Sequence, residues 1–184
     1  LKHTIPTEVS NIFHPAVKQA FKKLRLECDL VHICHPMWLA AIARVCKSHN
    51  VPVLMTLTDP WLLCARVLLD TGYKLCNGPE AGNKCISNCG FGAGIRSRYK
   101  DAKALFDMVD EVVVASRFLA TLFKSSGWNR GIRIIPHSVD YANVRRIEDA
   151  QPAYVTFVFI GTIGWHKGVH VLVKAFRKVP HRNM

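Results

Sequence analysis

Apolar residues recur along the chain in two alternating patterns. Short apolar runs are typical of buried strands, whereas apolar positions spaced three or four apart are typical of amphipathic helices. The runs predict strands over residues 29–34, 51–57, 111–115, 132–135 and 155–160. The periodic segments predict helices over 11–24, 37–48 and 169–179, and a further helix that begins after Ser116 as its N-cap. Asn50 follows the second of these helices and is a candidate left-handed cap.

Strands that alternate with helices are typical of βαβ units, which form a parallel sheet covered by helices on both faces. The pattern therefore predicts an α/β fold. It is interrupted over residues 61–98, where Gly, Asn, Pro and Cys crowd together without a period. Such a long irregular insert in a compact domain is usually functional or held by a cross-link. A polar stretch over residues 141–152 predicts a linker between one domain, residues 1–140, and a second, residues 153–184.

The net charge of +12 adds a preference for phosphate-bearing partners. Nucleotides, lipid headgroups and nucleic acid all fit that preference. The spacing of the basic residues, among them Arg96, Arg98 and Lys103, places most of them on the solvent-facing sides of helices. A membrane-surface patch is the alternative. No apolar stretch approaches the roughly 18–20 residues that a membrane-spanning helix needs.

A glycine-bearing turn over residues 159–168, Phe-Ile-Gly-Thr-Ile-Gly-Trp-His-Lys-Gly, leads from a predicted strand into a predicted helix. Gly161 would let the backbone approach an anion, and the helix N-terminus would offer free N–H groups. Lys167 would add a positive charge. The turn is neither GxGxxG nor a P-loop, so a tight structural turn remains the alternative.

Seven cysteines divide into two groups. Three lie in apolar periodic segments, where a thiol behaves as a small buried hydrophobe. The other four lie in the insert and are Cys64, Cys76, Cys85 and Cys89. Four thiolates suit tetrahedral zinc or another structural metal, and the spacing of the last two is at the wide end of a usual ligand pair. Free thiols and disulfides are the alternatives, although the lack of a secretory signal favours a reducing, cytoplasmic compartment.

Histidines and one aspartate stand at the ends of two predicted strands. His32 and His35 flank the end of the first strand, and Asp59 follows the second. For the histidines, ordinary hydrogen-bonded packing competes with a functional contact. For Asp59, a turn-forming or helix-capping role competes with a place in a site.

Five segments, in order, resemble glycosyltransferase family 4. Residues 29–32, Asp-Leu-Val-His, and 52–61, Pro-Val-Leu-Met-Thr-Leu-Thr-Asp-Pro-Trp, are similar to its first two motifs. Residues 112–116, Val-Val-Val-Ala-Ser, and 135–140, Ile-Pro-His-Ser-Val-Asp, are similar to the next two. Residues 159–176, which contain the glycine-bearing turn, resemble the start of the family's donor-binding domain.

The resemblance implies a GT-B fold, in which two Rossmann-like domains with helix-flanked parallel sheets face a cleft. It implies transfer, with retention, of a hexosyl unit from a nucleoside-diphosphate sugar to a hydroxyl of a glycan or lipid-linked saccharide, with no metal needed for transfer. Asp59 would be the catalytic residue beside the donor sugar, and Gly161, Thr162 and Lys167 would bind the donor. Such an enzyme would act in the cytoplasm or in peripheral contact with the inner face of the membrane.

Three positions depart from the family pattern: Thr162 replaces an arginine, Thr58 a histidine and Ser138 a glycine. The family pattern also predicts further segments at both ends of the chain, so we expect this chain alone to be inactive in transfer. A rival interpretation is a metal-stabilised, non-catalytic binding domain with a basic nucleic-acid-binding surface. A different nucleotide-binding Rossmann enzyme is less favoured, because no strand is followed by GxGxxG and a later acidic residue.

Overall fold

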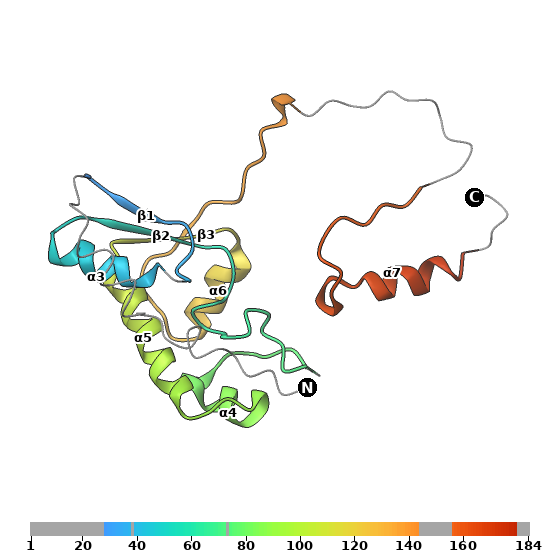
Figure 1. Ribbon diagram of the computed structural model, residues 1–184, viewed down its shortest axis with the longest axis horizontal. Helices are drawn as coiled ribbons and strands as arrows, with labels where there is room; N and C mark the ends of the chain where they lie inside the picture. Colours follow the sequence, from blue (N-terminus) through green and yellow to red (C-terminus); the bar gives the residue numbers. More distant parts are fainter. Residues whose placement is uncertain (1–27, 38, 73, 144–155, 180–184) are drawn as a thin grey trace. The chain divides into compact units, whose positions relative to one another are not determined.

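Two units make up the chain, Leu1–Ser138 and Val139–Met184, and each is considered by itself (Figure 1). The computed structural model describes residues 28–37, 39–72, 74–143 and 156–179. The helix predicted over 11–24 and most of the predicted linker lie outside these residues.

The first unit is built on a four-stranded sheet in the order β1-β2-β3-β4. All three pairings are parallel. The strands are β1 (Val31–Ile33), β2 (Val53–Leu57), β3 (Glu111–Val114) and β4 (Arg133–Ile134). Each lies within a predicted apolar run. The α/β class is therefore confirmed, and the parallel sheet with its helices is Rossmann-like.

The connections between these strands are helical. They contain α3 (Ala40–Ser48), α5 (Gly94–Met108) and α6 (Arg117–Ser125). In Figure 1 these three helices lie along one side of the sheet. Crossovers between parallel strands are right-handed, so a sheet whose strand order advances in one direction receives its helices on one face. The expected helices on the other face are not among the described residues.

Local signals set the ends of two of these helices. The Leu119 N–H donates to the Ser116 hydroxyl oxygen at 3.3 Å, so Ser116 is the N-cap of α6, as predicted. Beyond the C-terminal end of α3, Asn50 adopts the left-handed conformation, with φ of 57°. Asparagine tolerates this conformation better than most residues, and it turns the chain toward β2.

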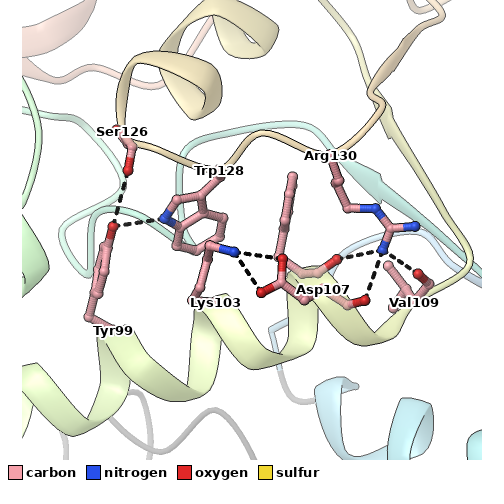
Figure 2. Close-up of polar contacts among 8 residues, drawn as sticks. Tyr99, Lys103, Asp107, Val109, Ser126, Trp128 and Arg130 are labelled. Carbon is pink, nitrogen blue, oxygen red and sulfur yellow. Dashed lines mark hydrogen bonds and ion pairs between the residues drawn. The ribbon is translucent and has the colours of Figure 1, made fainter.

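Aromatic side chains join α5 to α6 in the core. The rings of Phe106 and Phe123 stack at 5.5 Å between centroids, and Trp128 meets Phe106 edge-on at 4.9 Å. All three side chains are fully buried. The Trp128 Nε1–H donates to the Tyr99 hydroxyl at 2.7 Å, which satisfies the buried indole (Figure 2).

Arg130 holds the C-terminal end of α5 (Figure 2). Its guanidinium donates to the carbonyl oxygens of Phe106 at 2.8 Å and Asp107 at 3.2 Å, and also to that of Val109. A further bond of 2.6 Å reaches the Asp110 carbonyl. The last carbonyls of a helix lack intrahelical partners, and a cation at that end also interacts favourably with the helix dipole.

The region expected to be an irregular insert, residues 61–98, is partly helical. It contains a 3₁₀ turn, η1 (Glu80–Gly82), the short helix α4 (Asn83–Cys89) and the beginning of α5. Left-handed glycines at positions 82 and 90 bound α4. This organisation differs from the expected loop because glycine usually indicates a loop, whereas here two glycines cap a helix.

The second unit contains a 3₁₀ turn, η2 (Tyr141–Asn143), a second one, η3 (Trp165–Lys167), and helix α7 (Val169–Phe176). Residues 156–160 form no strand, contrary to the expectation for 155–160. A strand requires a hydrogen-bonded neighbour, and none of the described residues pairs with this run. No described residue of this unit is buried.

An apolar groove runs between residues 156–159 and α7 in the second unit. Its cavity is about 540 Å³, and its lining includes Phe157, Phe159, Leu172 and Phe176. Phe157 and Phe176 meet edge-on with ring centroids 5.6 Å apart. Ring contacts therefore hold the run to the helix even though both remain exposed.

No helix among the described residues is long and apolar enough to cross a membrane.

Candidate functional site

Polar side chains lie just beyond the carboxyl ends of two neighbouring strands of the sheet. β1 ends at Ile33 and β2 at Leu57, and the two strands pair in parallel. His35 and Asp59 lie two residues beyond these ends, and the His35 Nε2 is 3.0 Å from an Asp59 carboxylate oxygen. In open α/β sheets the carboxyl edge of the strands is the usual place of ligand binding.

The hydrogen bonds around His35 define its tautomer. The Met37 N–H donates to His35 Nδ1 at 3.1 Å, so Nδ1 carries a lone pair and Nε2 carries the proton. Nε2–H then donates to Asp59. Both ring nitrogens are thus engaged, and His35 orients the carboxylate.

Asp59 is fixed from a second direction. Its other carboxylate oxygen accepts the Trp61 N–H at 2.8 Å. The Asp59 side chain is 31% exposed, so the carboxylate is held at both oxygens while part of it still faces solvent. The Trp61 N–H contact is the turn-forming role considered for Asp59 from the sequence. The His35 contact adds a second interaction, from the segment that follows the neighbouring strand.

A second contact, between His32 and Thr56, lies within the same two strands. His32 Nε2 is 2.8 Å from the Thr56 hydroxyl, and His32 is exposed. Thr58 is exposed as well. The His32–Thr56 contact lies within β1 and β2, and the His35–Asp59 pair lies just beyond their carboxyl ends, where the fixed carboxylate is able to stabilise developing positive charge.

The glycine-bearing turn lies in the second unit. Gly161, Thr162 and Lys167 are all exposed. Gly168 precedes α7 with φ of 70°, in the left-handed region that glycine enters at little cost, and no side chain caps the helix. Trp165 stacks on His170, with centroids 3.7 Å apart, and this contact folds the turn onto the first turn of α7.

The four cysteines of the insert lie around one pocket of the first unit. Cys64, Cys76, Cys85 and Cys89 all line it. All seven cysteines of the chain carry free thiols in the structure. Burial, with a smaller contribution from the neighbouring thiols, raises the pKa of the Cys85 thiol to about 11. Burial also raises the pKa of Cys64.

The position of Arg98 differs from the one predicted from the sequence. Its spacing predicted a solvent-facing position, but the residue is only 2% exposed. Its guanidinium donates to the carbonyl oxygens of Leu62 at 3.3 Å and Trp61 at 2.5 Å, and it lies over the Trp61 ring. Burial lowers the pKa of Arg98 to about 10. Periodicity alone assigns arginine to the wet face, because it contains no signal for a buried carbonyl partner.

Comparison with protein-family models, curated proteins and solved structures gives no match to this chain. The class is therefore defined by the fold, an α/β protein with a Rossmann-like parallel sheet and a polar group at the carboxyl edge of two adjacent strands. The structure brings Asp59 together with His35, and it brings the four insert cysteines together. Gly161, Thr162 and Lys167 form a separate group in the second unit.

Proposed function

We propose that this chain is part of a nucleotide-sugar-dependent glycosyltransferase of the GT-B type. In this proposal the first unit belongs to the acceptor-side domain and the second unit begins the donor-binding domain. The enzyme would move a hexosyl unit, with retention, to a hydroxyl of a glycan or lipid-linked saccharide. The resemblance to glycosyltransferase family 4 suggests the reaction.

The observation that carries the proposal is the paired Asp59 and His35 at the carboxyl edge of β1 and β2. A carboxylate held by His35 Nε2–H and the Trp61 N–H is fixed in its direction. When a glycosidic bond to a nucleoside diphosphate breaks, positive charge develops on the sugar. A fixed carboxylate beside the sugar stabilises that charge without reorganising in the transition state.

The turn at Gly161 supports the donor half of the proposal. Gly161 and Thr162 are exposed, and Lys167 is exposed next to the start of α7. The first N–H groups of a helix and a nearby lysine both favour a diphosphate. They would also stabilise the charge that accumulates on the departing nucleoside diphosphate.

The cytoplasm is the proposed compartment, because nucleotide sugars and reduced thiols would both be found there. Contact with the inner face of the membrane would suit a lipid-linked acceptor and the positive net charge.

The test uses the protein expressed from its complete gene and a panel of labelled sugar donors, including UDP-glucose and GDP-mannose. Lys167→Ala should lower kcat/KM for the donor by about 10- to 1000-fold, through loss of one charge-assisted phosphate contact. Lys174→Ala removes an exposed lysine from the neighbouring helix α7 and is the matched control. We expect it to leave donor use unchanged.

Asp59→Asn should lower kcat by about 100-fold or more while the protein stays folded, as judged by circular dichroism. Asp29→Asn is its control, because Asp29 is an exposed carboxylate at the opposite end of β1. Normal turnover by both Asp59→Asn and Lys167→Ala would refute the site. Binding of single-stranded RNA with no response to any nucleotide sugar would favour the nucleic-acid-binding alternative.

A further inference from the structure

The pocket of the four cysteines draws on segments far apart in the chain. Cys64 follows β2, Cys76 lies in the loop beyond it, and Cys85 and Cys89 lie on α4. The last two are four residues apart on one helix, so their side chains share a face. Because all four line the same pocket, the fold gathers thiols that the sequence separates by as many as 25 positions.

The pocket is small and mainly apolar around the thiols. Its free volume is about 10 Å³, which is on the order of the space that one water molecule or one ion needs. Leu63, Leu69 and Phe91 contribute to its wall. An apolar wall around four sulfur atoms is typical of a structural metal site rather than of a reactive thiol, which needs an electropositive and accessible setting.

The thiols surround the pocket without meeting at one point. Among the described residues, no three His, Cys, Asp or Glu side chains are already set at metal-binding geometry. Cys76 donates its thiol to the Gly78 carbonyl oxygen at 3.4 Å, so this sulfur is engaged with backbone. For the four sulfur atoms to converge on one ion, the cysteine side chains would have to rotate about their Cα–Cβ bonds.

Arg98 supplies an independent observation. It is 2% exposed, it forms no ion pair with a carboxylate of the described residues, and its Nε has no hydrogen-bond partner there. A buried charge without a counter-ion is strongly destabilising. Its electrostatic neighbours are Cys64 and Cys85. A Zn²⁺ ion with four thiolates has a net negative charge, which would provide the missing counter-ion.

We propose that Cys64, Cys76, Cys85 and Cys89 bind one Zn²⁺ ion that cross-links the loop after β2 to helix α4. Each of the four thiols gives up its proton to solvent as its sulfur bonds to zinc, so four protons leave for each ion bound. The ion is structural, because all four tetrahedral positions are filled by protein and none is left for substrate. A single ion also fits the volume of the pocket better than an iron–sulfur cluster. The site is independent of the proposed sugar transfer.

Zinc titration of the metal-free, fully reduced chain tests the site directly. We expect about one equivalent to bind, and zinc to protect four thiols that are alkylated in the zinc-free chain. Mass mapping should place the protected thiols at the four pocket cysteines. Substitution with Co²⁺ should give the visible absorption of a tetrahedral thiolate complex. These measurements use the unmodified chain and need no activity.

Variants then separate ligation from folding. Cys89→Ser should lower zinc affinity by at least about 100-fold, while Cys89→His, which retains a zinc-binding side chain, should preserve stoichiometric binding. Cys46→Ala is the matched control, because Cys46 is buried in the main core outside the pocket and should not affect zinc.

Three outcomes would overturn the proposal. The first is equal alkylation of the four pocket thiols with and without saturating zinc. The second is copurification of iron with acid-labile sulfide, which would identify a cluster instead. The third is the formation of disulfides among these cysteines in the protein isolated from reducing cytoplasm.

Discussion

Two apolar runs of similar character behave differently in the two units. In β2 of the first unit, Val53, Met55 and Leu57 are at most 1% exposed. In the second unit, Phe157, Val158 and Ile160 are 60–91% exposed, and their run forms no strand. β2 has a parallel neighbour on each side, whereas none of the described residues pairs with residues 156–160. An apolar run becomes a strand only where neighbours satisfy its backbone and cover its side chains.

The helices of the two units repeat this difference. Helix α5 buries Ile95, Ala102, Leu105 and Phe106, while α7 buries none of its residues. An isolated helix of eight residues is marginal in water, because nucleation is costly and few hydrogen bonds follow it. The stability of the first unit should therefore depend on core packing, and that of the second should depend on little more than local contacts.

The largest expected effect separates two phenylalanines. Phe106→Ala should lower the free energy of unfolding by about 3–5 kcal/mol, because it removes a fully buried ring from the aromatic cluster. Phe176→Ala removes a ring that is 38% exposed and should change it by less than about 1 kcal/mol. Urea denaturation followed by circular dichroism measures both. Equal losses would show that α7 is buried against another surface.

A smaller effect separates two arginines. Arg130→Ala should cost about 1–3 kcal/mol, because it leaves carbonyl groups at the end of α5 without their donor (Figure 2). Arg177, at the end of α7, is exposed, and Arg177→Ala should stay within about 0.5 kcal/mol of the parent chain. The same denaturation curves provide the comparison. No loss for Arg130→Ala would mean that water replaces the guanidinium at these carbonyls.

The smallest effect concerns two aspartates and depends on pH. Lys47 Nζ and the Val53 N–H bond to the Asp110 carboxylate at 2.8 and 2.7 Å and hold its pKa below the usual range. Because the pKa is lower in the folded state, the stabilisation is present above the unfolded value of about 3.9 and is lost as pH falls toward the folded value. Asp110→Asn should cost about 1 kcal/mol or less at pH 7, since the carboxylate is partly exposed.

The difference between Asp110→Asn and the parent chain should shrink below about pH 4. Asp140 in the second unit is exposed and, among the described residues, accepts the Ala142 N–H, so Asp140→Asn is the control measured over the same range. Thermal unfolding between pH 3 and pH 7 measures the change for each variant. A constant difference across this range would exclude the carboxylate charge as the cause.

Hydrophobic periodicity predicted the four strands of the sheet and helices α3, α6 and α7 to within a few residues. Ser116 and Asn50 were recognisable as caps, because capping depends on the residue and its immediate neighbours. The long helix α5 was missed, since it begins among glycines and its buried face includes Arg98. Asp59 was recognisable by its position after a strand, but its pairing with His35 was not.

The sequence by itself determined the α/β class and the strands of the sheet, because these follow from the spacing of apolar residues along one segment. Tertiary structure alone decided which segments meet. It placed His35 beside Asp59 across two strands and gathered the four cysteines around one pocket. It also decided that residues 51–57 contain a strand while 156–160 do not. The physical reason is that backbone hydrogen bonds and burial between distant segments depend on the partner, which local sequence does not contain.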